Sequence, residues 1–369
     1  MTSIVVEPVD VLLFRDGKPF SAGSDHLARS VFPPHPGTLA GFVRSRLLRD
    51  ADLDWAKARE KFGNLGGPSD YGDFRITGFF LRKGEEDYVP VPTDLVCGKT
   101  SGNYFLVRPL RAEDASGLAS NFPQEQKDLL HPWVRTGEPI ESAHGFISLR
   151  NLFEYILAGQ APPRNALLQE SDFALREART IVGLAKTSLT SDPGRLATIE
   201  FVRMLDGASF HLRFEGVRWP GNVGLGTLGG EGRTVRWKVL ENWVPPDAKK
   251  VMESIKSTGR FKVVLLTPAI FEGGWVPKRR LQELLKQKGV EARLVAAIVN
   301  RPAHVGGFDL HRRAPKPMFP AAPAGSVYYY EVVKGDVAGL VNSLEMSCIS
   351  DRDWEVGMGL SVVGGWEYA

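Results

Sequence analysis

Cysteine is scarce in this 369-residue sequence: Cys97 and Cys348 are its two cysteines, and neither lies in a Cys-x-x-Cys or Cys/His spacing. Their scarcity argues against a disulfide framework and a zinc site, and it favours a reducing compartment. Long apolar runs are also lacking, since no stretch approaches the length that crosses a bilayer. The first residues include Glu7 and Asp10 and lack the apolar core of a signal peptide. We therefore expect a soluble, cytoplasmic protein without a membrane partner.

An excess of charge of one sign is missing as well. Lysine and arginine number 46 against 43 aspartates and glutamates, which gives a formal net charge of +3. A uniformly basic surface is thereby excluded, so any contact with nucleic acid must come from local clusters. The chain is long for a single core, and prolines at 245 and 246 mark a candidate linker. We expect an N-terminal domain of residues 1–243, with insertions, and a C-terminal domain of residues 244–369.

Known catalytic motifs are absent: there is no Gly-x-Ser-x-Gly, no His-Glu-x-x-His and no kinase signature. Asp309, His304 and His311 lie close in sequence but lack a fourth ligand and a fixed spacing, so we expect no metal. Asp25-His26 could act as acid and base on an RNA 2′-hydroxyl, although a histidine beside an aspartate is usually a simple loop pair. We expect a protein that is not an enzyme and that binds no cofactor.

Glycine, by contrast, is concentrated in residues 221–233, which read GNVGLGTLGGEGR. The run is too rich in glycine for a helix or a regular strand, because glycine loses the most backbone freedom on ordering. It contains Gly-x-Gly-x-x-Gly, but a dinucleotide loop requires a helix next, and residues 234–240 alternate like a strand. Either the run is a tight turn that serves the fold, or it exposes main chain to a polyanion. In the second case the candidate RNA contacts are Gly226, Gly229, Gly230 and Arg233.

A helix is predicted to begin at Thr38 as N-cap, with a buried stripe of Leu39, Val43 and Leu47 and with Arg44 on a solvated face. A second helix follows Ser148 as N-cap. Residues 210–214 alternate, which predicts a half-buried strand with His211 and Arg213 on a polar face. Residues 110–142 are irregular. Further helices are expected at 247–257, 278–288 and 336–346, and further strands at 4–14, 74–81, 181–185, 198–205, 261–266, 292–300 and 327–333.

The chain also contains a degenerate internal repeat. Gly224-x-Gly226, Gly229-Gly230 and Trp237 in the first half are echoed by Gly357-x-Gly359, Gly364-Gly365 and Trp366 in the second. Each half interleaves strands and helices without a strict βαβα order, which argues against a doubly wound parallel sheet. The pattern predicts an α+β protein of two ferredoxin-like (RRM-like) domains with glycine-rich loops.

Residues 301–316 form the most basic local cluster. Prolines and Gly306-Gly307 interrupt it, so we expect a flexible loop, which suits phosphate contacts on single-stranded RNA. Phe308, Tyr328 and Tyr330 could stack on bases, although each one taken singly is more often a packing residue. The candidate RNA contacts in this cluster are Arg301, His304, Arg312, Arg313 and Lys316.

Several segments together resemble one family. Residues 12–20 (LLFRDGKPF) and 30–41 (SVFPPHPGTLAG) resemble the start of CRISPR RAMP proteins, and most of all the third subunits of Cmr (type III-B) effector complexes. Residues 228–233 resemble the glycine loop of those subunits, and residues 307–328 resemble their second-half signature. Lys18 and Gly37 stand where arginine and serine are more usual.

The resemblance implies two RAMP-type ferredoxin-like domains and no nuclease activity. It implies antiviral defence, with a subunit that holds the 5′ tag of the guide (CRISPR) RNA and contacts the large polymerase-like subunit and neighbouring RAMP backbone subunits. Arg15, Lys18 and Arg29 lie in or beside the first motif and join the candidate RNA contacts. Two alternatives stay open: a RAMP endoribonuclease that processes CRISPR repeat RNA with His26 as base, and a structural adaptor that contacts protein alone.

Overall fold

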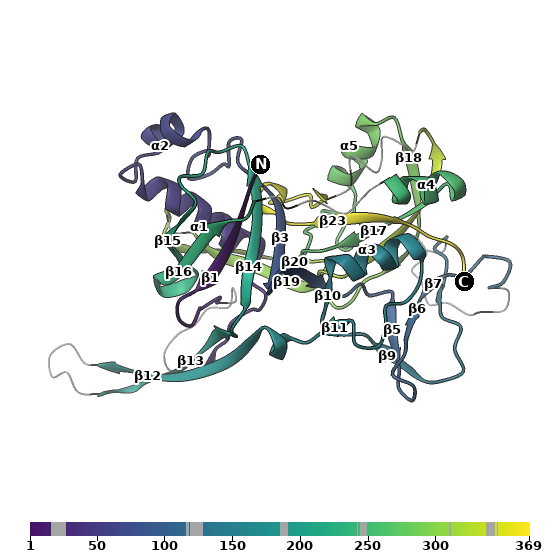
Figure 1. Ribbon diagram of the computed structural model, residues 1–369, viewed down its shortest axis with the longest axis horizontal. Helices are drawn as coiled ribbons and strands as arrows, with labels where there is room; N and C mark the ends of the chain where they lie inside the picture. The colour runs from purple at the N-terminus through teal and green to yellow at the C-terminus, as the bar shows by residue number, and fades with distance from the viewer. Residues whose placement is uncertain are drawn as a thin grey trace.

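Two antiparallel sheets dominate the computed structural model (Figure 1), which describes residues 1–15, 27–115, 118, 128–184, 191–241, 243, 249–309, 311–336, 344 and 346–369. The larger sheet has the strand order β11 (Leu167–Leu168), β10 (Phe146–Ser148), β4 (Glu86–Pro90), β3 (Arg75–Lys83), β14 (Ala208–Glu215), β1 (Thr2–Pro8), β16 (Arg233–Val239) and β15 (Val223–Leu228). The smaller sheet has the order β18 (Glu291–Ile298), β21 (Val327–Lys334), β17 (Arg260–Leu265), β23 (Leu360–Gly365) and β22 (Ser347–Cys348).

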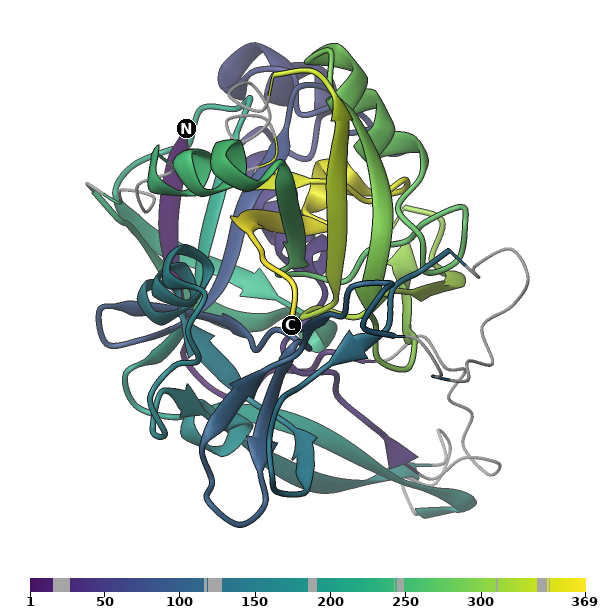
Figure 2. The ribbon, with the colours of Figure 1, turned by 90° about the vertical axis from the view of Figure 1, so that its right-hand side faces the viewer.

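Four sheets of two or three strands and five α-helices complete the described part of the chain. These sheets are β12 (Ala174–Leu184) with β13 (Ser191–Met204) and β2 (Leu27–Ala28), β19 (Ala303–Asp309) with β20 (Ala314–Ala321), β5 (Leu95–Gly98) with β6 (Tyr104–Leu106) and β9 (Ile140–Ser142), and β7 (Arg108–Pro109) with β8 (Pro132–Trp133). The helices are α1 (Pro36–Arg49), α2 (Trp55–Phe62), α3 (Leu149–Ala158), α4 (Lys249–Thr258) and α5 (Arg279–Gln287). In Figure 2 the strands of the smaller sheet face the viewer, and the blue strands β5 and β6 lie below them.

This architecture confirms a mixed α/β protein with antiparallel sheets, while its division into two ferredoxin-like domains at residue 243 stays a prediction. Residues 242 and 244–246 of the candidate linker lie outside the described residues, as does most of the helix expected at 336–346. Helix α3 connects the two sheets: it directly follows β10 of the larger sheet, and a Cβ built on Gly364 of β23 in the smaller sheet would lie 2.5 Å from its Ile156 Cγ2. A Cβ on Gly365 would lie 2.3 Å from Ser254 Oγ of α4. Glycines in β23 thus let two helices approach the strand closely.

The first predicted helix is α1, and its buried stripe is as expected. Leu39, Val43 and Leu47 are fully buried against the larger sheet. The N-cap lies three residues earlier than predicted, because Pro36 fits the first turn of the helix and His35 takes the N-cap position. Arg44 is not solvated as predicted: its guanidinium donates to the Asp70 carbonyl at 2.9 Å and packs on two aromatic rings, those of Trp55 and Tyr71.

Strand β14 departs furthest from its predicted environment. The prediction of a half-buried strand is wrong, since His211 is fully buried and Arg213 is 8% exposed. The face that carries them is covered, and His211 Nδ1 lies 2.7 Å from Asp87 Oδ2. Asp87 also accepts from Arg82 Nη1 at 2.8 Å and from Trp243 Nε1 at 2.8 Å. Burial raises the pKa of Asp87, but the hydrogen bonds from His211 and Arg82 outweigh it, and the pKa is lowered.

The remaining predictions were correct in type more often than in extent. Ser148 caps α3 as expected, because its hydroxyl accepts from Asn151 N at 3.2 Å. The first strand ends at Pro8 rather than at residue 14, since Pro8 is followed by a bend. The segment 110–142 is irregular where described except for the short strands β8 and β9, and Leu130 N donates to Val295 O of the smaller sheet at 2.7 Å.

Candidate nucleic-acid interface

The candidate RNA contacts fall in two places on the structure. The first is the base of the β12–β13 ribbon. There the chain around Leu12 pairs with Val202 of β13 through two backbone hydrogen bonds of 2.8 Å. Next to it, Phe14 N donates to the buried Ser30 Oγ at 3.2 Å, and Arg15 forms a β-bridge with Ser30. This pairing brings the segments that carry Arg15 and Arg29 next to each other, and both side chains are exposed.

The glycine-rich run closes over this same segment. Gly230 N donates to the Leu13 carbonyl at 2.7 Å. Gly229 has a φ of 74°, and a Cβ on it would lie 2.5 Å from Leu13 O. No other residue type fits both the positive φ and this distance. The run therefore fixes the path of the chain that leads into the first motif.

Part of the run is a regular strand, contrary to prediction. Gly224 and Gly226 lie in β15, where a Cβ would come within 2.6 Å of the Trp237 ring and 2.5 Å of Phe42 Cε2, respectively. Glycine alternates with Val223 and Leu225, so the glycines face the core while the larger side chains face solvent. At these positions the close approach is made by the protein's own side chains, and contact of Gly226, Gly229 and Gly230 with RNA stays a prediction.

Arg233 follows the run and is held by neighbours. Its Nη2 lies 2.5 Å from Glu231 Oε2, its Nη1 lies 3.8 Å from Asp10 Oδ2, and its guanidinium packs on the Phe201 ring. Two carboxylates therefore offset its charge. Lys18, together with Asp25 and His26 of the nuclease alternative, lies outside the described residues.

The β12–β13 ribbon itself was not foreseen as one element. Two short strands were expected, but β12 and β13 pair over most of their length and extend away from the rest of the molecule (Figure 1). Its arginines alternate with glutamates, and Arg176 lies 3.0 Å from Glu200 Oε1. Leu175, Ile181 and Val182 are about half exposed. The alternation of charges from residue 174 onward was the signal that could have shown a longer strand.

The second place is the β19–β20 hairpin, which replaces the flexible loop predicted for residues 301–316. The two strands pair from Ala303 with Ala321 to Asp309 with Ala314. Prolines are tolerated because the hairpin forms a separate two-stranded sheet, where the missing N–H groups need no partner strand. Val305 and Ala321 are buried in the core of the larger sheet and anchor the base of the hairpin.

The outer part of the hairpin carries the basic residues. Asp309 Oδ1 accepts from the backbone N–H groups of His311 and Arg312, at 3.0 Å each, which closes the turn. These backbone hydrogen bonds, that of Arg312 foremost, lower the pKa of Asp309. Arg313 adopts a positive φ of 52° at the tip. All five candidate cations are exposed: Arg301, His304, Arg312, Arg313 and Lys316.

Of the three aromatic residues considered for stacking, Phe308 alone is exposed, at 55%. Tyr328 and Tyr330 are buried in the core of the smaller sheet, and Tyr330 stacks on Phe261 with ring centroids 5.1 Å apart. The packing interpretation is therefore correct for both tyrosines. Phe308 lies among the hairpin cations, where a nucleobase could stack on its ring while the cations contact phosphates.

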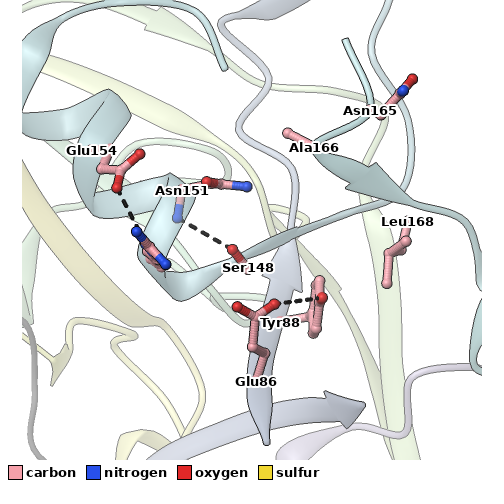
Figure 3. A pocket seen from close by; sticks show the side chains of 9 residues that line it. Glu86, Tyr88, Ser148, Asn151, Glu154, Asn165, Ala166 and Leu168 are labelled. Carbon is pink, nitrogen blue, oxygen red and sulfur yellow. Dashed lines mark hydrogen bonds and ion pairs between the residues drawn. The ribbon is translucent and has the colours of Figure 1, made fainter. Parts of the chain in front are cut away.

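A polar cavity of about 280 Å³ lies beside the start of α3 (Figure 3). Its charged side chains are matched by their neighbours: Arg150 Nε lies 3.4 Å from Glu154 Oε1, and the Tyr88 hydroxyl donates to Glu86 Oε2 at 2.9 Å. Burial, followed by the bond to Glu86, raises the pKa of Tyr88 to about 12. These charged and polar side chains of the cavity thus already have partners within the protein.

The structure so far defines a class: a mixed α/β protein with two antiparallel sheets, from which two arginine-bearing β ribbons emerge. None of the described helices is both long and apolar enough to cross a membrane. A family model described as CRISPR-associated protein (Cas_Cmr3) matches residues 4–366. The chain therefore belongs to the Cas_Cmr3 family, which confirms the resemblance seen in its motifs and makes it a subunit of a type III-B CRISPR effector complex.

Solved structures with some likeness include two chains of type III-B Cmr-beta complexes. The first, bound to cognate target RNA and AMPPnP, is 14% identical with a TM-score of 0.49, over 89% of this chain and 86% of that one. The second, bound to cognate target RNA, is 15% identical with a TM-score of 0.47 and the same coverage. A chain of a type III-A Csm3–Csm4 subcomplex is 13% identical with a TM-score of 0.39 over both whole chains. No curated protein matches the sequence.

Proposed function

We propose that this subunit is non-catalytic and holds the 5′ tag of the guide RNA. The observation that carries the proposal is the β19–β20 hairpin, in which Arg312, Arg313 and Lys316 are exposed beside the exposed ring of Phe308. Asp309 is the single acidic residue in the hairpin, so the cations outnumber the carboxylates. Cations beside an exposed aromatic ring suit the backbone and the unstacked bases of single-stranded RNA.

A second contact is proposed at the base of the β12–β13 ribbon. Arg15 and Arg29 are exposed there, and Lys18 follows in the same sequence motif. Arg233 is close to Glu231 and Asp10, so we assign it the smaller share of any RNA contact. The guide RNA would then touch the subunit at two places, with the hairpin as the stronger one.

The hairpin is tested by charge reversal. Electrophoretic binding assays with labelled guide RNA over a range of salt concentrations compare the protein with the double variant Arg312→Glu/Arg313→Glu. We expect weaker binding and a log–log salt slope that falls by about 0.7 for each lost phosphate contact. The matched control reverses Lys286 and Lys288, which are exposed at the end of α5, and should bind as the unaltered protein does. Equal RNA affinity in both double variants would reject the hairpin as the RNA contact.

The nuclease alternative has its own test. Pure protein is incubated with labelled CRISPR repeat RNA, and we expect no specific product. Cleavage at one position that His26→Ala abolishes would overturn the non-catalytic assignment.

The adaptor alternative is tested by ultraviolet crosslinking in the assembled complex, where we expect an RNA adduct on a peptide from the β19–β20 hairpin.

We also propose that the subunit contacts the large polymerase-like subunit through the edge strand β15. Val223 and Leu225 project from this strand and are 72% and 60% exposed, and β15 is the last strand of the larger sheet. An exposed edge with apolar side chains is a common site of strand addition by a partner. The variant Val223→Glu/Leu225→Glu should fail to co-purify with the large subunit while keeping its affinity for guide RNA.

A further inference from the structure

A second cavity, of about 350 Å³, lies where the larger sheet meets the elements around the smaller one. Strands β3 and β14 of the larger sheet form one wall. Helix α5, strand β22 and the turn Trp354–Val356 contribute residues to the other. Three arginines from three different elements line this cavity: Arg75, Arg213 and Arg280.

Arg213 is a buried cation without a carboxylate partner. It is 8% exposed, and it lies opposite Gly78, whose missing side chain leaves room for the arginine: a Cβ there would lie 3.1 Å from Arg213 Cδ. Its guanidinium packs on the Trp243 ring at 3.8 Å, and its Nη2 contacts Met1 Sδ, a weak acceptor. Among the described residues it makes no ion pair. Burial lowers its pKa, against the more distant charges of Asp87 and Glu215.

The other two arginines share one indole ring. The guanidinium carbons of Arg75 and Arg280 lie 4.8 Å and 3.9 Å from the centre of the Trp354 ring. Arg75 is fixed further by hydrogen bonds from its Nη1 to the carbonyls of Gly72 and Phe74, at 2.8 Å and 2.7 Å. The cations are thus held in place by stacking and by backbone oxygens. The indole ring, already covered by guanidinium groups, is poorly placed to stack on a nucleobase.

Two buried polar atoms at the cavity lack partners in the described part of the chain. They are Thr77 Oγ1 and Arg280 Nε. Buried polar atoms of this kind are normally satisfied, so each one leaves a hydrogen-bonding position for water or a ligand. Arg75, Ile76 and Thr77 all line the cavity, at a point where the pairing of β3 with β14 shifts register and leaves Thr77 without an opposite residue.

The charges of the cavity do not balance. Three arginines line the cavity with a single carboxylate, that of Glu215, and Arg280 Nη1 also lies 3.9 Å from Glu283 Oε2 on its own helix. Cys348 also lines the cavity, and burial raises the pKa of its thiol to about 12, so it adds no negative charge near neutral pH. A set of fixed guanidiniums with an unpaired hydroxyl is suited to a tetrahedral oxyanion, which accepts several charge-assisted hydrogen bonds at once.

From these observations we propose that the cavity between β3, β14 and α5 binds a phosphate group through Arg75, Arg213, Arg280 and Thr77. The phosphate comes either from a free phosphate species or from the phosphorylated end of an RNA strand. Because Arg213 and Thr77 belong to the larger sheet and Arg280 to α5, the bound group links the two parts of the molecule. The site is independent of the β19–β20 hairpin and does not rest on the proposed function.

The test measures phosphate binding directly. Isothermal titration with inorganic phosphate, at constant ionic strength kept with sodium chloride, should give saturable binding at one site, and the thermal midpoint should rise with phosphate. Arg280→Gln should lower the affinity about tenfold or more, since it removes a charge-assisted bond. Lys286→Gln removes one charge from the same helix on an exposed position and should leave the affinity unchanged. If Arg280→Gln does not fold, Thr77→Val is used in its place.

Competition identifies the source of the phosphate. Guide RNA with a terminal phosphate should displace inorganic phosphate, while the same RNA with a terminal hydroxyl should not, if an RNA end is the ligand. Failure of both RNAs to compete assigns the site to a free phosphate species. Absence of saturable phosphate binding, or equal affinity in Arg280→Gln and the unaltered protein, overturns the proposal. Saturable binding of a glutamate-rich peptide without any binding of inorganic phosphate also overturns the proposal, because the cavity would then hold a protein carboxylate.

Discussion

Asp94 Oδ2 lies 2.9 Å from Lys262 Nζ, and both side chains are buried although 168 positions separate them in the chain. Tyr155 of α3 donates to Asp94 Oδ1 at 2.6 Å, and Tyr329 of β21 donates to Asp94 Oδ2 at 2.8 Å. Burial lowers the pKa of Lys262, and Asp94 opposes that shift. One carboxylate thus ties the chain after β4, helix α3 and two strands of the smaller sheet into a single network.

Removal of the Asp94 carboxylate should strongly destabilise the folded protein. We expect Asp94→Asn to lower the free energy of unfolding by about 3–5 kcal/mol, because it leaves the Lys262 ammonium buried without a partner. Urea unfolding followed by tryptophan fluorescence measures the change. The control is Asp52→Asn, whose partner Lys57 lies 3.1 Å away on the surface, with a loss of at most about 1 kcal/mol. Losses of similar size in both variants would show that burial of the Asp94 pair has no special weight.

The Asp87 network predicts a pH dependence. The pKa of Asp87 is lowered in the folded state, so its contribution to stability is present above the unfolded value of about 3.9. It is lost as pH falls through the folded pKa. The difference in unfolding free energy between the protein and Asp87→Asn should therefore be largest near pH 7 and shrink below about pH 4. Urea titrations from pH 7 to pH 3 measure it, and a difference that does not change with pH would contradict the assignment.

Substitution of two glycines by alanine should change the free energy of unfolding in opposite directions. Gly226→Ala places a methyl group against Phe42, where a Cβ would lie 2.5 Å from Cε2, and we expect a loss of about 1–3 kcal/mol from overpacking. Gly41, within α1, has nothing within 4 Å of its Cβ position. Gly41→Ala should raise stability by about 0.5–1 kcal/mol, since alanine favours a helix interior. Thermal unfolding of both variants decides it, and stabilisation by Gly226→Ala would show that β15 does not pack on α1 as described.

Sequence rules predicted correctly those features that depend only on residues close together in the chain. The Ser148 cap and the Leu39 stripe depend on residues within a few positions, so both could be predicted from sequence. The environments of Arg44 and His211 depend on contacts with distant segments, at Asp70 and Asp87. No periodic pattern carries that information, which is why a solvated face and a half-exposed strand were predicted instead.

The candidate site shows the same limit. The basic residues of 301–316 could be found from composition alone, but glycines and prolines concealed a hairpin whose strands pair with each other and, among the described residues, with no third strand. The density of glycine located the run at 221–233, yet the reason for its glycines is the approach of Phe42, Trp237 and Leu13. The arginine cavity was missed entirely, because Arg75, Arg213 and Arg280 are brought together by the tertiary fold.

Substitution of Phe308 tests the contribution of base stacking to RNA binding at the hairpin separately from that of the cations. Phe308→Leu keeps an apolar side chain of similar size on β19 but removes the aromatic face, so affinity for guide RNA should fall by about 1–3 kcal/mol if one base stacks there. The salt slope should stay the same, because no phosphate contact is lost, whereas Arg312→Glu/Arg313→Glu lowers it. Phe308→Trp serves as the control and should retain or improve binding. A reduced salt slope in Phe308→Leu would mean that the substitution had moved the neighbouring cations, and unchanged affinity would remove Phe308 from the interface.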